Sequence, residues 1–213
     1  MGGRFITLEG GEGVGKSTQA RLLADALAAR GLEVVLTREP GGTAGAEIIR
    51  GLLLDAGGEG WSPAAEALLF AAARADHVER LIRPALARGA WALCDRFLDS
   101  SRAYQAGEGG LTDEDIIKLH RIGAGGLMPD LTLLIEVGAE AAAARLCLRD
   151  LSGSDRIGAR DPAYHAQVAR RFSALAAAEP ARFARIDGIG EPTEVHGRIM
   201  RAVDALLAPA NGE

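Results

Sequence analysis

The feature that most restricts what this chain can fold into is the glycine-rich octet GGEGVGKS at positions 10–17. It matches the pattern G-x-x-x-x-G-K-[ST] at every fixed position. An apolar run, Phe5 to Leu8, precedes the octet, and a helical pattern begins at Thr18. A strand, a glycine-rich loop and a helix in this order predict a site for phosphate groups. We therefore expect the chain to bind a nucleoside triphosphate.

The residue types in the octet explain why it suits that ligand. Glycines adopt backbone angles closed to other residues, which turns several N–H groups toward one anion. Lys16 is expected to reach the β- and γ-phosphates, and the Ser17 hydroxyl is expected to ligate Mg²⁺. A glycine turn that binds nothing is the alternative, and the complete octet disfavours it. The predicted binding residues are Gly10, Gly11, Glu12, Gly13, Val14, Gly15, Lys16, Ser17 and Thr18.

Composition limits the remaining possibilities. The chain has 213 residues, 48% of them apolar, which suits one α/β domain with its own core. Without a membrane-length apolar run or a signal-peptide pattern, a cytoplasmic location and no membrane contact are expected. The net charge of −5 argues against a nucleic-acid partner. Cys94 and Cys147 lack metal-site spacing and are interpreted as buried thiols.

Hydrophobic periodicity predicts strands alternating with helices. Strands are expected at Phe5–Glu9, Glu33–Thr37, Trp91–Asp95, Leu131–Val137 and Phe183–Asp187. Helices are expected at Thr18–Arg30, Ala44–Leu54, from Pro63 to Ala75 or beyond, at Arg80–Arg88 with a kink at Pro84, and at Asp113–Ala124, Ala139–Leu148, Tyr164–Ala178 and Pro192–Leu207. This alternation predicts a parallel sheet with helices on both faces and ligands at the carboxyl ends of its strands.

Three strand ends bring polar residues to that edge of the sheet. Asp95 can hold Mg²⁺, and Arg96 beside it can clamp a phosphate, although an ordinary surface ion pair is the alternative. Glu9 is a second metal candidate. Arg38 opens a turn-rich loop that points it toward the site, unless the loop is only a connection capped by Thr43.

Two later segments carry candidate nucleotide contacts. Phe70 and Arg74 lie one helical turn apart, so they can stack on a base and bind its edge. By pattern alone, a core Phe and a surface Arg fit this pair better. Residues 100–105 are interpreted as a short loop in which Ser101, Tyr104 and Gln105 can contact a nucleotide, the alternative being a polar loop with one buried Tyr.

Residues 149–161 are polar, contain glycine and serine, and are predicted to form a mobile loop. The arginines around it are Arg145, Arg149, Arg156 and Arg160. Arginines on a closing lid are what phosphoryl transfer requires, because charge develops on the transferred group. A solvated charge run is the usual alternative for such a segment. The glycines and the Asp155-Arg156 pair favour a lid.

Taken in order, these segments resemble the bacterial type of the thymidylate kinase family. The resemblance spans nearly the whole chain and is carried by Glu9 to Thr18, Thr37 to Thr43, Leu69-Phe70 with Arg74, Asp95-Arg96-Phe97, Ser101 with Ala103-Tyr104-Gln105, Pro129 to Thr132 and Asp155-Arg156. The octet is shared by many families, whereas the combination of the REPGGT, DR and AYQ segments is highly specific. The resemblance implies a P-loop NTPase three-layer fold with a five-stranded parallel sheet. It also implies one domain over residues 1–213, with a lid at about 149–161.

The resemblance also implies an activity. The enzyme is expected to transfer the γ-phosphoryl group of ATP directly and in line to dTMP, with Mg²⁺, and to give dTDP for dTTP biosynthesis. The resemblance also implies a homodimer. It assigns Lys16, Arg96, Arg149 and Arg156 to catalysis and Ser17, Asp95 and Glu9 to the metal. The residues it assigns to dTMP are Glu12 near the 3′-hydroxyl, Arg38 and Arg96 on the phosphate, Phe70, Arg74, Ser101 and Gln105 around the base, and Tyr104 against the deoxyribose.

One variation within the family and two departures from its pattern qualify this assignment. Gly13 stands where some members have an Arg, so the catalytic Arg is expected from the lid. Phe97 replaces a Tyr or His, and Gly158 replaces a Glu whose role is lost or moves to Asp161. Two rival functions remain. One is another nucleoside monophosphate kinase or a deoxynucleoside kinase, and the other is a nucleotide-dependent switch protein.

Overall fold

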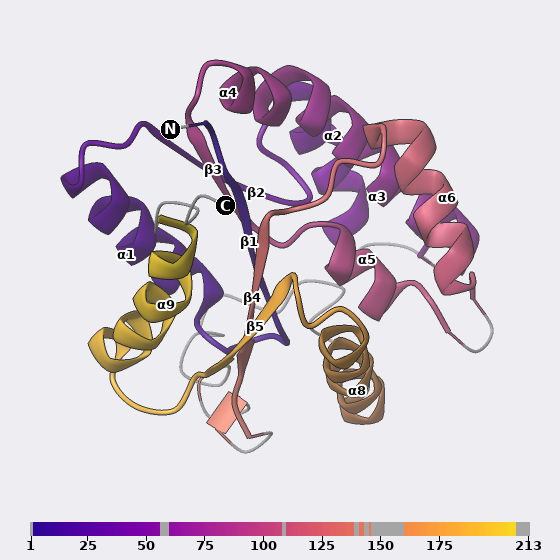
Figure 1. The fold of residues 1–213 in the computed structure, drawn as a ribbon. Helices are drawn as coiled ribbons and strands as arrows, with labels where there is room; N and C mark the ends of the chain where they lie inside the picture. Colours follow the sequence, from indigo (N-terminus) through magenta and orange to yellow (C-terminus); the bar gives the residue numbers. More distant parts are fainter. Residues whose placement is uncertain are drawn as a thin grey trace.

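The computed structural model describes residues 2–55, 60–107, 110–138, 141–142, 145 and 160–207. Its five-stranded sheet has the order β2-β3-β1-β4-β5, and every strand pair is parallel (Figure 1). The strands are β1 (Phe5–Glu9), β2 (Val34–Arg38), β3 (Trp91–Asp95), β4 (Leu131–Glu136) and β5 (Phe183–Asp187). The predicted α/β fold is confirmed. Only the bounds of β2 and β4 differ from prediction: β2 is shifted by one residue and β4 ends one residue earlier.

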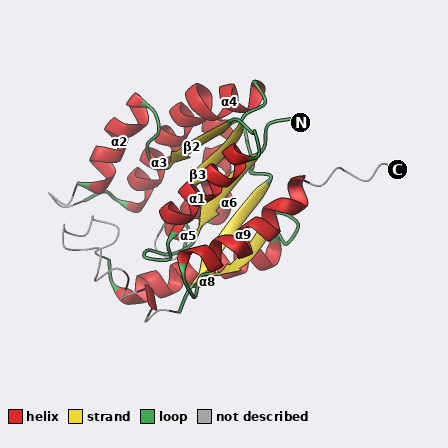
Figure 2. Cartoon of the chain, turned by 90° about the vertical axis from the view of Figure 1, so that its left-hand side faces the viewer, coloured by secondary structure: helices red, strands yellow, loops and turns green. Residues whose placement is uncertain are grey.

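Helices cover both faces of the sheet (Figures 1 and 2). On one face lie α1 (Lys16–Ala29) and α9 (Pro192–Leu207), which pack against each other. The other side carries α3 (Pro63–His77), α4 (Arg83–Ala87), α5 (Leu98–Tyr104), α6 (Asp113–Ala124) and α8 (Pro162–Ala178), with α2 (Ala44–Leu54) packed on α3. The helices α2, α6 and α9 have their predicted bounds, whereas α1 and α8 begin two residues early.

The central strand β1 is buried on both faces, as its continuous apolar run predicted. Ile6 and Leu8 pack with α1 and α9, and Phe5 packs into a second cluster on the opposite face. The alternation follows from the two-residue period of a strand. Burying each such side chain contributes about 2 kcal/mol to stability. The buried strand β1 therefore holds the loop that follows it in a fixed position.

The helical segment around Pro84 is continuous but locally widened. The helix α3 runs through a π-helical turn, η1 (Val78–Ile82), into α4. Proline lacks an N–H, and its ring clashes with the carbonyl four residues earlier in a regular α-helix. The π turn ends two residues before Pro84 and includes Arg80, whose carbonyl would meet the proline ring, so it relieves that conflict at the place where a kink was predicted.

One sequence-based prediction is wrong here. Most of the segment 100–105, predicted to be a loop, belongs to the helix α5. Its N-terminus is capped from outside: the Glu9 carboxylate accepts hydrogen bonds from Phe97 N at 2.8 Å and Ser100 N at 3.3 Å. The two serines favour turns in isolation, and the capping carboxylate comes from a distant strand. Local sequence therefore could not reveal this helix.

Part of the predicted secondary structure lies outside the described residues. This applies to most of the helix predicted over 139–148, although residues 141, 142 and 145 are helical. It also applies to most of the predicted lid, including Arg149, Arg156 and Gly158, and to Cys147. Within the part of the chain that is described, no helix combines the length and the apolar character needed to cross a bilayer.

Candidate active site

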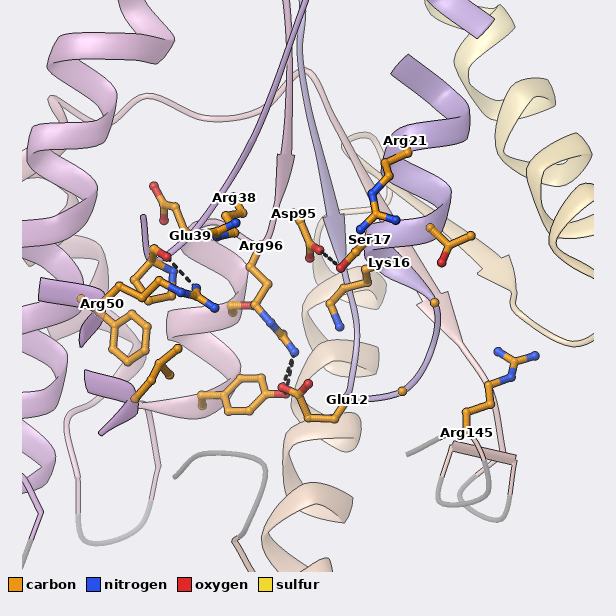
Figure 3. Close-up of a pocket in the computed structure, with 18 of the residues that line it drawn as sticks. Glu12, Lys16, Ser17, Arg21, Arg38, Glu39, Arg50, Asp95, Arg96 and Arg145 are labelled. Atoms are coloured by element: carbon orange, nitrogen blue, oxygen red, sulfur yellow. Dashed lines mark hydrogen bonds and ion pairs between the residues drawn. The ribbon is translucent and has the colours of Figure 1, made fainter. Parts of the chain in front are cut away.

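A pocket of about 550 Å³ opens where β1, β2 and β3 end (Figure 3). This is the edge at which parallel α/β sheets bind ligands. The residues that line it are Glu12, Gly13, Gly15, Lys16, Ser17, Thr18, Arg21, Arg38, Glu39, Pro40, Arg50, Leu54, Phe70, Asp95, Arg96, Ser100, Tyr104, Gln105 and Arg145. We call residues 10–17 the phosphate loop. We call the wall built by the end of β2, by Arg96 after β3, and by α2, α3 and α5 the acceptor side.

Backbone geometry shapes the phosphate loop. Gly10 has φ 136°, and a Cβ there would lie 2.4 Å from the carbonyl oxygen of Ile135. Gly15, with φ 97°, is the N-cap of α1. Both positions thus require glycine, the first by contact and conformation and the second by conformation. The loop consequently delivers the N-terminus of α1 into the pocket, where its dipole favours an anion.

Lys16 is held inside this loop. Its ammonium donates to the carbonyl oxygens of Gly10 at 3.2 Å and Gly11 at 2.6 Å. Burial, and then the nearby charge of Arg96, lowers the pKa of Lys16 to about 8. A cation whose solvation has been removed gains more from an incoming phosphate than an exposed lysine would.

Ser17 and Asp95 form an oxygen pair at the pocket floor. The Ser17 hydroxyl donates to Asp95 Oδ2 at 2.5 Å (Figure 3). A hydroxyl and a carboxylate are hard oxygen ligands, and Mg²⁺ is usually held by one or two such groups together with phosphates and water. The described residues hold no group of three or more His, Cys, Asp or Glu side chains arranged for a metal. The pair fits Mg²⁺ that is bound together with a nucleotide.

The structure places Glu9 apart from that pair. Its carboxylate is fully buried, does not line the pocket and accepts a hydrogen bond from Ser100 Oγ at 2.6 Å. Burial, and then the neighbouring Asp99 carboxylate, raises the pKa of Glu9 to about 8. Its contacts are those of a cap for α5.

Arg96 joins the phosphate loop to the acceptor side. It donates to the Gly10 carbonyl oxygen at 3.0 Å and pairs with Glu12 at 2.5 Å. Its guanidinium lies over the Tyr104 ring, 5.1 Å from the centroid. Burial disfavours its charge, but Glu12 and other neighbours outweigh that effect and raise the pKa of Arg96. Its φ of 70°, unusual for a residue other than glycine, is maintained by these contacts.

Further cations line the pocket. Arg38 is exposed and pairs with Glu47, and Arg50 donates to the Pro40 carbonyl at 2.7 Å. In Figure 3, Arg38, Arg50 and Arg96 lie on one side of Lys16, whereas Arg21 and Arg145 lie on the other. The cations therefore fall into two groups around a single pocket.

Sequence reasoning left Arg21, Arg50 and Leu54 out of the predicted site. Arg21 follows Ser17 by four residues, and Leu54 follows Arg50 by four. The four-residue spacing of a helix places Arg21 on the same face as Ser17, which had already been assigned to the site. The same spacing places Leu54 on the same face as Arg50. Arg145, noted in sequence only as part of the arginine cluster, donates to the carbonyl oxygens of Val14 and Gly188.

The acceptor side rests on a buried polar network. Phe70 lines the pocket, but Arg74 and Ser101 lie behind the wall, and Arg74 is only 3% exposed. Arg74 donates to Glu39 at 2.7 Å and to Ser101 Oγ at 2.9 Å, and the second Glu39 oxygen contacts His77. Glu39, absent from the predicted site, thus holds the Arg74 side chain in place.

The remaining predicted residues fall into three places. Tyr104 and Gln105 line the pocket from the end of α5. Phe97 fills the core edge-on to Phe5, with ring centroids 4.8 Å apart. Arg160, one of the lid candidates, is paired with Glu66 on α3 and lies over the Tyr164 ring. The positions of Arg149 and Arg156 lie outside the described residues.

A parallel sheet wound on both faces, with a phosphate loop after its central strand, defines a nucleotide-binding α/β protein of the P-loop class. Comparison with known proteins narrows the class. A family model described as thymidylate kinase matches residues 8–199, and the chain belongs to that family. The chain is accordingly an enzyme, an ATP-dependent nucleoside monophosphate kinase, which removes the switch-protein alternative.

Individual relatives agree with the family model. The chain is 58% identical over 207 residues to the thymidylate kinase of Rhizorhabdus wittichii, covering 97% of this chain and 100% of that protein. It is 46% identical over 208 residues to the thymidylate kinase of Bradyrhizobium diazoefficiens, covering 97% and 91%. The crystal structure of thymidylate kinase from Ehrlichia chaffeensis superposes with a TM-score of 0.75 at 32% identity, covering 95% of this chain and 99% of that one.

Proposed function

We propose that this enzyme phosphorylates dTMP to dTDP with the γ-phosphoryl group of Mg-ATP and so serves dTTP biosynthesis. The observation that carries the proposal is the division of cations around one pocket. Lys16 and the N-terminus of α1 suit a triphosphate, while Arg38, Arg50 and Arg96 face it from the acceptor side. Arginines on that side match the phosphate of a monophosphate acceptor, which a nucleoside lacks.

The reaction is a direct in-line transfer. An oxygen of the dTMP phosphate bonds to the γ-phosphorus of ATP as the bond from that phosphorus to the ADP oxygen breaks. The attacking oxygen is already anionic at neutral pH, so no strong base is needed. Lys16 and Arg96 bind and neutralise the phosphates, with Arg149 and Arg156 proposed to add charge from the lid. Mg²⁺, held by Ser17 and Asp95, would neutralise the triphosphate.

The acceptor side provides contacts for the rest of dTMP. We assign Phe70 to the face of thymine and Gln105 to its edge, and we assign Arg74 and Ser101, which do not line the pocket, to the support of the wall behind them. Tyr104 lies against the deoxyribose and disfavours a 2′-hydroxyl. Glu12 approaches the 3′-hydroxyl.

A coupled ADP-release assay tests this function. Mg-ATP is offered with dTMP, dUMP, UMP, CMP, AMP, GMP or thymidine, one acceptor at a time. We expect strong turnover on dTMP, weaker turnover on dUMP and little on UMP. Turnover on thymidine but not on dTMP would instead establish a nucleoside kinase and make Asp95, which lines the pocket, the base to examine.

We also propose a homodimer. Exposed apolar side chains occur on the neighbouring helices α2, α3 and α6, led by Ile122 at 83% and Ile48 at 71% exposure. Exposed apolar side chains that gather into one contiguous patch mark an interface. Light scattering should give twice the monomer mass, and Ile122→Glu should shift the enzyme toward monomer. The cytoplasmic location and the lack of a nucleic-acid partner stay predictions.

A further inference from the structure

Beside the pocket, four side chains form a closed brace around Gln105. Gln105 Nε2 donates to Glu66 Oε1 at 3.0 Å, and the other oxygen of Glu66 pairs with Arg160. Arg160 also donates to the Tyr164 hydroxyl, which in turn donates to the Tyr104 carbonyl oxygen at 2.8 Å. These contacts therefore begin at the Gln105 side chain and end at the backbone of the preceding residue, Tyr104. Both residues are held in place.

The brace determines which way the Gln105 amide faces. A carboxylate that pairs with an arginine only accepts hydrogen bonds, so Gln105 must offer it the NH₂ group rather than the oxygen. Gln105 lines the pocket, and among the described residues its Oε1 has no hydrogen-bond partner. The orientation thus leaves an acceptor available to a ligand.

Glu66 is well placed to orient the Gln105 amide toward a base that stacks on Phe70. It lies one helical turn before Phe70 on α3, so both side chains project from the same face of that helix. Glu66 is itself buried and does not line the pocket. It therefore acts on a ligand indirectly, and of its two partners, Gln105 and Arg160, Gln105 is the one that lines the pocket.

We propose that Glu66 is a positioning residue that sets pyrimidine specificity by fixing the Gln105 amide, an inference that rests on the proposed function. With its oxygen toward the pocket, Gln105 accepts the N3–H of a thymine or uracil ring. A cytosine ring has an acceptor at N3, so two acceptors would face each other without a proton between them. Buried polar groups left unpaired are the strongest basis for rejecting a near-isosteric substrate.

The test uses Glu66→Gln and three acceptors. A glutamine at 66 can donate to Gln105 Oε1, which lets the amide turn and offer its NH₂ group to N3 of cytosine. The probe is 5-methyl-dCMP, which matches dTMP except at positions 3 and 4 of the ring. We expect its kcat/KM relative to dTMP to rise about tenfold, the size of one hydrogen bond. Where turnover is slow, its inhibition constant against dTMP replaces kcat/KM.

Internal controls separate positioning from general loosening of the pocket. The dUMP-to-dTMP ratio and the KM for ATP should stay within about twofold, since dUMP keeps the N3–H. Glu33→Gln, which removes the same charge from an exposed ion pair with Arg88, should leave all the ratios as in wild type. If Glu66→Gln fails to fold, Glu66→Leu with Arg160→Leu removes the pair without leaving a charge unpaired and should relax specificity in the same way.

The outcomes are distinct. An unchanged 5-methyl-dCMP ratio in a folded variant that still uses dTMP would overturn this inference alone. So would a dUMP ratio that rises in parallel, because it would mean a loosened pocket. A wild-type enzyme without dTMP turnover would overturn the proposed function and this inference together.

Discussion

The phosphate loop and the acceptor side hold their cations by different means. Lys16 is bound by carbonyl oxygens of its own loop, five and six residues away. Arg96 is bound by Glu12, 84 positions distant, and Arg74 by Glu39, 35 positions distant. One side is therefore made by backbone conformation within a contiguous segment, whereas the other is made by ion pairs between separate elements.

This difference predicts how the two sides respond to mutation. Loop geometry set by glycine and by a buried strand persists when one side chain is removed. Buried ion pairs do not, because losing one partner leaves the other charge unpaired. Activity and stability should therefore separate in the phosphate loop and change together on the acceptor side.

The largest effect on activity is expected from Lys16→Ala. We expect kcat to fall about 10³-fold, because a cation aimed at the transferred phosphoryl group is lost. The melting temperature should stay the same or rise, since a charge that is costly to bury has been removed. Lys118→Ala, which removes an exposed lysine on α6, is the matched control. A marked loss of stability in Lys16→Ala would break the comparison.

Arg96→Ala should lower both activity and stability. We expect kcat/KM for dTMP to fall about 10²-fold and the free energy of unfolding to fall by about 1–3 kcal/mol, because the ion pair with Glu12 and the hydrogen bond to the Gly10 carbonyl are lost. Arg96→Lys should recover part of the stability but little of the activity, since lysine lacks the planar fork. Arg88→Ala, in an exposed pair, should change neither quantity. Full stability in Arg96→Ala, measured by urea titration, would argue that this ion pair is not structural.

Glu39→Ala tests the buried network directly. Leaving Arg74 unpaired should lower the free energy of unfolding by about 3–5 kcal/mol, and the KM for dTMP should rise about tenfold. The KM for ATP should not change, because the phosphate loop is built independently. Glu39→Gln keeps a hydrogen-bond acceptor for Arg74, so its stability and its KM for dTMP should lie between those of the wild type and of Glu39→Ala. Equal rises in both KM values would contradict an independent loop.

The smallest effect concerns acid stability. Burial, and then the charge of Arg74, lowers the pKa of His120 to about 4, so the folded state keeps the ring neutral. The unfolded chain binds a proton near pH 6.5, and stability must therefore fall as the pH drops from 6.5 toward 4. Between pH 7 and 5 this group should cost about 2 kcal/mol. His120→Gln should flatten that part of the profile, and parallel profiles for both proteins would rule the group out.

Sequence reasoning succeeded wherever the cause was local. The octet, the strand β1 and the helix α6, with its capping Thr112, each carry their signals within a few adjacent residues. It failed at α5, whose cap is the distant Glu9. It also assigned Arg74 to the base, whereas the structure buries Arg74 behind the pocket wall against Glu39, and no periodicity links these two residues.

The sequence by itself determined the fold class, the phosphate loop and the family, because these depend on residues close together in the chain or on motifs in a fixed order. Only the tertiary structure decided which carboxylate pairs with which cation, and which carboxylates face the pocket. It separated Asp95, which contacts Ser17 in the pocket, from Glu9, which is buried as a helix cap. It also gave Glu66 its place against Gln105. The physical reason is that an ion pair depends on distance in space, and hydrophobic burial of separate elements sets that distance.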